Sequence, residues 1–96
     1  MASPENFKRN PDVSWRTIEG QAVLVHNRNG EIVVVNEVAT RIWECLDQEF
    51  ETIIRNICAE FEVGEDEARM DAEGFIQELI GAGFAFPAAR STGAEG

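Results

Sequence analysis

The sequence has no apolar run long enough to cross a membrane. A membrane-spanning helix needs about 20 consecutive apolar residues, and no stretch of the 96 residues approaches that length. The first residues also lack the basic-then-apolar form of a signal peptide. We therefore expect a cytoplasmic protein that has no membrane partner.

Cysteine and histidine are scarce. The two cysteines, Cys45 and Cys58, fall on the apolar stripes of predicted helices, where free cysteine behaves as a small hydrophobe. One pair would be a sparse disulfide framework for a secreted domain. The single histidine, His26, lies in a predicted strand, and no spacing of Cys or His indicates a metal site. We expect no metal and no cofactor.

Motifs that identify the large enzyme classes are missing as well. The sequence contains no phosphate-binding P-loop, no dinucleotide fingerprint and no nucleophile elbow. Its many carboxylates lie along predicted helix surfaces, without a basic or nucleophilic partner beside them. Because catalysis needs a nucleophile or base that a third group orients, the sequence predicts a protein that is not an enzyme.

Positive charge is scarce in the second half of the chain. The net charge is −10; residues 1–43 carry five basic and five acidic side chains, whereas residues 44–78 carry twelve acidic groups against Arg55 and Arg69. Proteins bind nucleic acid through Lys and Arg that neutralise phosphates, so this distribution argues against a nucleic-acid partner. A solvated, solubilising surface explains most of the excess.

The chain is organised around a strand that runs directly into a helix. The β-branched run from Ile32 to Val35 is typical of a strand with neighbours on more than one side. Asn36 is a strong candidate for the N-cap of the following helix. That helix is indicated by apolar residues at helical spacing, which include Val38, Ile42, Cys45 and Leu46.

Two further strands precede this junction. Residues 13–18 alternate apolar and polar side chains, residues 21–26 form a second apolar run, and Asn29-Gly30 is a strong hairpin signal before the third strand at 31–35. The economical topology is an antiparallel meander. It leaves the third strand at an edge of the sheet.

Two more helices are predicted after the junction. Thr52 is the candidate cap of the second helix, and the third helix begins at the acidic residues 65–67 and ends near Gly81. We expect an α+β protein with one domain at residues 13–86. An irregular N-terminal arm at 1–12 and a flexible C-terminal tail at 87–96 complete the chain.

Two features predict recognition of a peptide. An exposed strand edge presents unpaired N–H and C=O groups, to which a peptide can add as a further strand. The third helix has an apolar stripe wider than a small core needs, and either of its flanks could wall a groove. One flank consists of Ile76, Ile80, Arg69 and Glu73, and the opposite, smaller flank consists of Met70, Gly74, Gln77 and Gly81. Periodicity does not settle which flank faces the third strand. The alternative is that the third helix or the N-terminal arm covers the edge. The candidate peptide-binding residues are Glu31, Ile32, Val33, Val34, Val35, Asn36, Arg69, Ala72, Glu73, Ile76 and Ile80.

An ordered set of motifs resembles the PqqD-like family, also called the RiPP recognition element, where RiPP denotes a ribosomally synthesised and modified peptide. Val35-Asn36-Glu37, Ile42-Trp43 and Leu46-Asp47 match its LN-x(5)-IW-x-LLDG signature, with Val35 in place of Leu and Gln48 in place of Gly. Asp71-Ala72, Phe75-Ile76, Leu79 and Gly83 follow its DV-x(2)-FL-x(2)-L-x(3)-G pattern, with Ala72 in place of Val. The resemblance covers about residues 11–85.

This resemblance implies a winged-helix-like fold, with a three-stranded antiparallel sheet followed by three helices. It also implies that the leader segment of a precursor peptide pairs with the third strand, in the groove beside the third helix. A modifying enzyme, often a radical SAM protein, then acts on the peptide. We expect a monomer or a weak homodimer, since an open edge can also pair with its own copy.

Two alternatives from other classes are a winged-helix DNA-binding protein, or its acidic mimic, and a structural subunit of a larger enzyme. Against DNA binding, the third helix carries six acidic residues and one basic residue, Arg69. The acidic residues are Glu65, Asp66, Glu67, Asp71, Glu73 and Glu78.

Overall fold

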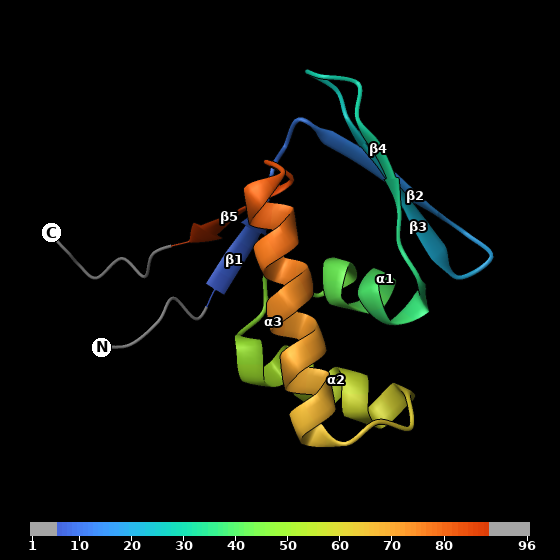
Figure 1. Cartoon of the computed structure of the whole chain (residues 1–96), viewed down its shortest axis with the longest axis vertical. Coiled ribbons are helices and arrows are strands. Elements are labelled where there is room, and N and C mark those ends of the chain that lie inside the picture. The colour runs from blue at the N-terminus through green and yellow to red at the C-terminus, as the bar shows by residue number, and fades with distance from the viewer. Residues whose placement is uncertain (1–5, 89–96) are drawn as a thin grey trace, which may run out of the picture.

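The computed structural model describes residues 6–88 of the chain, which form five strands and three helices (Figure 1). In chain order, these elements are β1 (Asn6–Arg9), β2 (Val13–Ile18), β3 (Gln21–His26), β4 (Ile32–Val34), α1 (Glu37–Glu44), α2 (Phe50–Glu60), α3 (Glu65–Gly81) and β5 (Ala85–Ala88).

Strands β2, β3 and β4 form the predicted antiparallel meander, with β4 at one edge. Both chain reversals use positive φ angles. Glu19 and Gly20 have φ of 53° and 83°, as a two-residue type I′ hairpin turn requires. Three helices follow the meander, so the α+β class and the order of these six predicted elements are confirmed, while β1 and β5 were not predicted. The likeness to winged-helix proteins stays a prediction.

Helix α1 begins where the sequence predicts. The Ala39 N–H donates to Asn36 Oδ1 at 2.8 Å, which satisfies one of the free donors of the first turn. One turn further on, the buried Thr40 hydroxyl accepts from the Ala22 N–H at 2.8 Å. The junction between β4 and α1 is therefore fixed both by a cap and by a buried hydrogen bond to β3.

Helix α2 begins three residues earlier than predicted. The residue before its first turn is Glu49, whose side chain makes no cap hydrogen bond, and Thr52 lies inside the helix. Phe50, the first helical residue, is half-buried against the core. Packing of this ring outweighs the capping preference of Thr52, since most helical stability in proteins comes from tertiary packing. Helix α3 has the predicted bounds.

The prediction of an irregular arm over residues 1–12 is wrong for the described part. Residues 6–9 form β1, which pairs antiparallel with β5 to make a second sheet, the β1–β5 ribbon. Figure 1 shows this ribbon on one side of α3 and strand β4 on the other. The predicted tail is partly replaced by β5, which includes Pro87; residues 89–96 lie outside the described residues.

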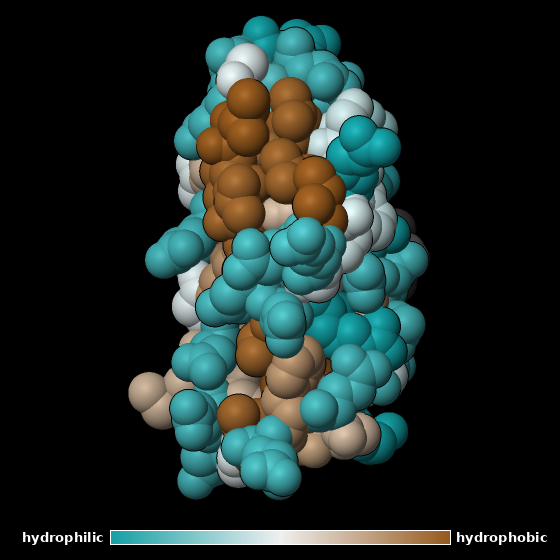
Figure 2. Space-filling model, turned by 90° about the vertical axis from the view of Figure 1, so that its right-hand side faces the viewer, coloured by the Kyte–Doolittle hydropathy of each residue, from teal (hydrophilic) through white to brown (hydrophobic). Residues whose placement is uncertain are grey.

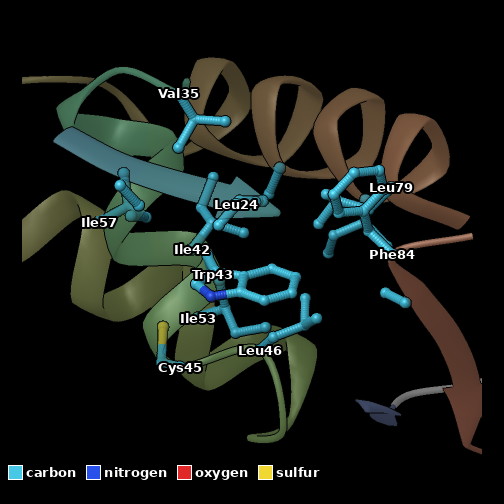
Figure 3. Close-up of a cluster of buried hydrophobic side chains, with 14 of the residues drawn as sticks. Leu24, Val35, Ile42, Trp43, Cys45, Leu46, Ile53, Ile57, Leu79 and Phe84 are labelled. Carbon is cyan, nitrogen blue, oxygen red and sulfur yellow. The ribbon is translucent and has the colours of Figure 1, made fainter. Parts of the chain in front are cut away.

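The core fills the space between the inner face of the meander and the three helices. Trp43 is completely buried at its centre, with Leu24 of β3 and Phe84 nearby (Figure 3). Trp15 of β2 meets the Trp43 ring edge-on at a centroid distance of 6.0 Å. The other large side chains that are fully buried are Ile42, Leu46, Ile53, Ile57 and Ile76.

His26 and the two cysteines belong to this packing. His26 is buried and meets the Phe84 ring edge-on at 5.4 Å. Cys45 and Cys58 are free, and burial raises the pKa of the Cys45 thiol. Within residues 6–88, no group of three or more acidic, His or Cys side chains is placed to hold a metal ion. None of the helices in this range combines the length and apolarity of a membrane span.

Candidate functional site

The hydrogen bonds of β4 follow a fixed alternation. The Val35 N–H donates to the Ala22 carbonyl at 3.0 Å, and the His26 N–H donates to the Glu31 carbonyl at 2.8 Å. In an antiparallel ladder, every second residue of a strand bonds to its partner. The odd-numbered residues from 31 to 35 therefore bond to β3, and the even-numbered residues direct their main-chain groups to the other side.

Ile32 and Val34 thus present two N–H and two C=O groups at the open edge of the sheet. Among residues 6–88, no strand other than β3 pairs with β4. Proteins usually block such an edge with charge, proline or a bulge, and β4 contains no proline and no charged residue. Within the described part of the N-terminal arm, β1 does not cover the edge, because it pairs with β5 instead. This edge can accept one more strand.

The outer face of the meander is apolar beside this edge. Ile32 pairs with Val25, and Val34 pairs with Val23. The side chains of Ile32 and Val34 are 62% and 60% exposed, and Figure 2 shows the apolar patch over this part of the molecule. Val33 points to the opposite face and packs against the core. An added strand would place alternate side chains on the apolar patch and on the helix side of the sheet.

The remaining candidates near β4 have structural roles. Glu31 lies in the hairpin turn, where its N–H donates to Asn29 Oδ1 at 2.9 Å. The Val35 side chain is buried in the core, and the Asn36 side chain caps α1. The exposed main chain and side chains at this edge therefore belong mainly to residues 32 and 34.

The candidates on α3 lie around a separate cavity of about 570 Å³, called here the ribbon cavity. Four of the α3 candidates line this cavity, namely Arg69, Glu73, Ile76 and Ile80. The fifth, Ala72, is fully buried in the core. The structure does not bring these α3 residues together with the β4 edge, because none of residues 31–36 lines the cavity. The residues that line it are Phe7, Glu49, Phe50, Glu51, Arg69, Glu73, Ile76, Gln77, Ile80 and Pro87.

Sequence reasoning missed the segments that complete this cavity. Phe7 comes from β1, Pro87 from β5 and Phe50 from the start of α2. The only signal for the first of them is that Phe7 is the one aromatic side chain among residues 1–12. No local pattern indicates that this residue lies close to α3, which follows it by more than fifty positions.

The single basic residue of α3 is already bound to carboxylates. The Arg69 guanidinium donates to both oxygens of Glu51, at 2.7 and 3.0 Å, and to Glu65 at 2.8 Å. These partners raise the pKa of Arg69, and the hydrogen bonds from Arg69 lower the pKa of the Glu51 carboxyl. The guanidinium also lies over the Phe50 ring at 5.8 Å. Arg69 therefore joins α3 to the first turn of α2.

The sequence matches a family model described as coenzyme PQQ synthesis protein D (PqqD) over residues 21–85. The chain belongs to the PqqD family. This confirms the resemblance that the sequence motifs indicate. The match begins at β3 and ends at the first residue of β5, so Phe7 and Pro87 of the ribbon cavity lie outside it. No curated protein sequence matches this PqqD-family chain.

Two solved structures are similar to this PqqD-family protein. One is TbiB1 in complex with the TbiA(beta) leader peptide, with a TM-score of 0.78 and 27% sequence identity, covering 85% of this chain and 98% of that chain. The other is lasso peptide synthetase B1 complexed with the leader peptide, with a TM-score of 0.77 and 25% identity, covering 85% and 99%.

Proposed function

We propose that this PqqD-family protein binds the leader segment of a precursor peptide as a strand added to β4, and presents that peptide to a modifying enzyme. The observation that carries the proposal is the open edge of β4, where Ile32 and Val34 direct four main-chain groups outward. The complexes of the two similar proteins with leader peptides support it.

Main-chain pairing would supply affinity with little demand on the leader sequence, and alternate side chains would supply specificity. Leader residues opposite Ile32 and Val34 would lie on the apolar patch of the outer face. A residue opposite Val33 would point towards the helices. We therefore expect a leader segment with apolar side chains at alternate positions.

The role of the protein would be binding rather than catalysis. Holding the precursor beside an enzyme raises its effective concentration, up to about the millimolar range for short tethers. We propose a cytoplasmic protein whose enzyme partner is a radical SAM protein or another peptide-modifying enzyme. We also propose that the protein is a monomer or a weak homodimer, in which the same edge would be the point of contact.

Amide hydrogen exchange tests the proposal at single residues. The probe is the leader segment of a short precursor encoded beside the gene for this chain. In the free protein, the Ile32 and Val34 amides face the open edge and should exchange quickly, whereas the Val33 amide bonds to β3 and should exchange slowly. Leader binding should protect the two outward amides and leave the Val33 amide nearly unchanged.

A titration followed by NMR complements the exchange experiment. Shifts should concentrate in residues 31–36 and along α3, because the added strand would lie between these elements. Shifts confined to the acidic loop at residues 47–51, without protection of the Ile32 and Val34 amides, would contradict strand addition to β4.

A further inference from the structure

The ribbon cavity has the size and lining of a binding site, and strand addition to β4 does not use it. Its volume of about 570 Å³ falls in the range of pockets that hold small ligands or large side chains. Phe7, Phe50, Ile76, Ile80 and Pro87 supply an apolar lining. An aromatic or branched side chain would therefore gain apolar contact on entering it.

The charged side chains around the cavity favour an occupant with a positive charge. Three carboxylates line it, those of Glu49, Glu51 and Glu73, against the single guanidinium of Arg69. Arg69 is bound by Glu51 and by Glu65, so its charge is already neutralised. Within residues 6–88, neither Glu49 nor Glu73 forms an ion pair. The cavity therefore disfavours anions and favours a basic group placed beside an apolar one.

The position of the cavity allows it to be occupied together with the β4 edge. The cavity is completed by the β1–β5 ribbon, and this ribbon and β4 lie on opposite sides of α3 (Figure 1). None of residues 31–36 lines it. A protein that presents a bound peptide to an enzyme needs a second contact surface, which the bound peptide must leave free.

We propose that the ribbon cavity is the docking site for the modifying enzyme, which inserts a large apolar side chain flanked by Lys or Arg. This inference rests on the proposed function, because it names the surface that meets the enzyme. The apolar side chain would fill the space between the two phenylalanine rings and α3. The flanking basic groups would meet Glu49 and Glu73.

A pair of charge-matched peptides tests the chemistry of the cavity. The probes are acetyl-Gly-Lys-Phe-Lys-Gly-amide and the same peptide with Glu in place of both Lys. At low salt, the lysine peptide should shift the NMR signals of Glu49, Phe50 and Glu73 and bind at least about tenfold more tightly than the glutamate peptide. Equal binding of the two peptides would overturn the proposal. Benzyl alcohol that binds as tightly as the lysine peptide would also overturn it, since the cavity would then be a small-molecule site.

Two substitutions on α3 provide a matched control. Glu73→Lys and Glu78→Lys change the net charge equally at exposed positions, but only Glu73 lines the cavity. Glu73→Lys should weaken binding of the lysine peptide by about fivefold or more, and Glu78→Lys by less than about twofold. Similar losses in the two variants would show that the peptide responds only to net charge.

The decisive measurement is the affinity of the protein for a peptide-modifying enzyme encoded beside its gene. Glu49→Lys, at an exposed position that lines the cavity but is not among the candidate leader-binding residues, should raise the dissociation constant for this enzyme by about fivefold or more, while affinity for the leader peptide stays unchanged. An unchanged enzyme affinity would overturn the docking proposal and leave strand addition standing. If the unmodified protein does not bind the leader peptide, the proposed function itself is contradicted. Failure of the docking proposal and failure of the proposed function are therefore distinguishable.

Discussion

The two sheets of the molecule differ in whether their exposed edges are blocked against pairing with another strand. Strand β4 offers an apolar edge with free main-chain groups, and nothing in its three residues prevents another strand from pairing. The β1–β5 ribbon carries Pro87 in β5, which removes one donor, and Lys8 and Arg9 in β1. Proline and charge are common means of blocking an edge. The same chain therefore blocks one edge and leaves the other open.

This difference is what the proposed binding of a peptide at the open edge of β4 would require. An unblocked apolar edge exposes a protein to aggregation, and a single proline in β4 would remove much of that hazard. The ribbon shows that the chain tolerates such blocking residues elsewhere. The contrast supports strand addition at β4 and predicts that the two sheets respond differently to substitution.

The largest effect should come from proline placed within β4. Val33→Pro removes an N–H that bonds to β3 and leaves a carbonyl of Leu24 without its donor. We expect a loss of about 3 kcal/mol in the free energy of unfolding. Val34→Pro removes an N–H that points to the open edge, a position where edge strands accept proline. It should cost less than about 1 kcal/mol but weaken leader binding at least tenfold.

Thermal or urea unfolding and calorimetric titration with the leader peptide measure these two effects. Equal destabilisation by both proline variants would show that the alternation along β4 is wrong. Full leader binding by a folded Val34→Pro variant would show that this strand does not pair with the peptide.

Attachment of the β1–β5 ribbon to the rest of the fold should depend most on Arg9. Its guanidinium donates to the Trp43 carbonyl at 2.7 Å, at the C-terminus of α1, and lies 5.9 and 5.7 Å from the Trp15 and Trp43 ring centroids. Arg9→Ala should lower the free energy of unfolding by about 2 kcal/mol, because a charge-assisted hydrogen bond and cation–π contacts are lost. Lys8→Ala is the control, since Lys8 is exposed. Matching unfolding curves for the two variants would contradict an anchoring role for Arg9.

The salt dependence of binding separates the peptide hypothesis from DNA binding. Pairing at β4 should be mainly main-chain and apolar, so affinity for the leader should fall by about tenfold or less between 50 mM and 500 mM salt. Contacts with many phosphates typically lose about 10³-fold or more. Dissociation constants for the leader and for a random DNA duplex across this range provide the measurement. Tight duplex binding with a steep salt slope would favour the DNA alternative.

A smaller effect is expected at the junction of β4 with α1. Asn36→Ala removes the oxygen that accepts from the Ala39 N–H. Loss of an N-cap costs about 1 kcal/mol, and the fold should survive because the core is untouched. Asn27→Ala, which removes an exposed hydrogen bond to Ser14, is a suitable control. An unchanged melting temperature for Asn36→Ala would show that this cap contributes nothing to stability.

The smallest effect should come from the ion pair beside the ribbon cavity. Hydrogen bonds from Arg69 lower the pKa of the Glu51 carboxyl, so the pair stabilises the folded state above the unfolded pKa of Glu51. This contribution is lost as the pH falls through the lowered folded pKa. The melting temperature of Glu51→Gln should lie slightly below that of the unmodified protein at pH 7, and the difference should disappear once the pH has fallen below the lowered folded pKa of Glu51. A difference that grows on acidification would contradict this sign.

Local signals were sufficient to predict much of the fold. The alternation at residues 13–18, the Asn29-Gly30 turn and the Asn36 cap each act within a few residues of the chain. They therefore predict the meander, its order and the start of α1 from the sequence alone. The bounds of α3 follow in the same way from its acidic first turn and the glycines after it.

Long-range packing decided the features that the sequence did not predict. Residues 6–9 form a strand only because they pair with β5, almost eighty residues later. Helix periodicity identified Ile76 and Ile80 as one flank of α3, but periodicity carries no information on what packs beside that flank. The peptide-binding role of the predicted residues stays a prediction. The structure places Ile32 and Val34 at the open edge of β4 and Ile76 and Ile80 at the ribbon cavity, and no local pattern indicates this separation.

The pairing of β1 with β5 has a consequence for protein engineering. Asn6 lies directly opposite Ala88, so the described chain enters and leaves the fold at neighbouring points. Folds whose ends lie close together tolerate insertion into a loop of another protein. Residues 6–88 are therefore a suitable insert for a host protein, because the host would need to open only about one interstrand spacing, roughly 5 Å.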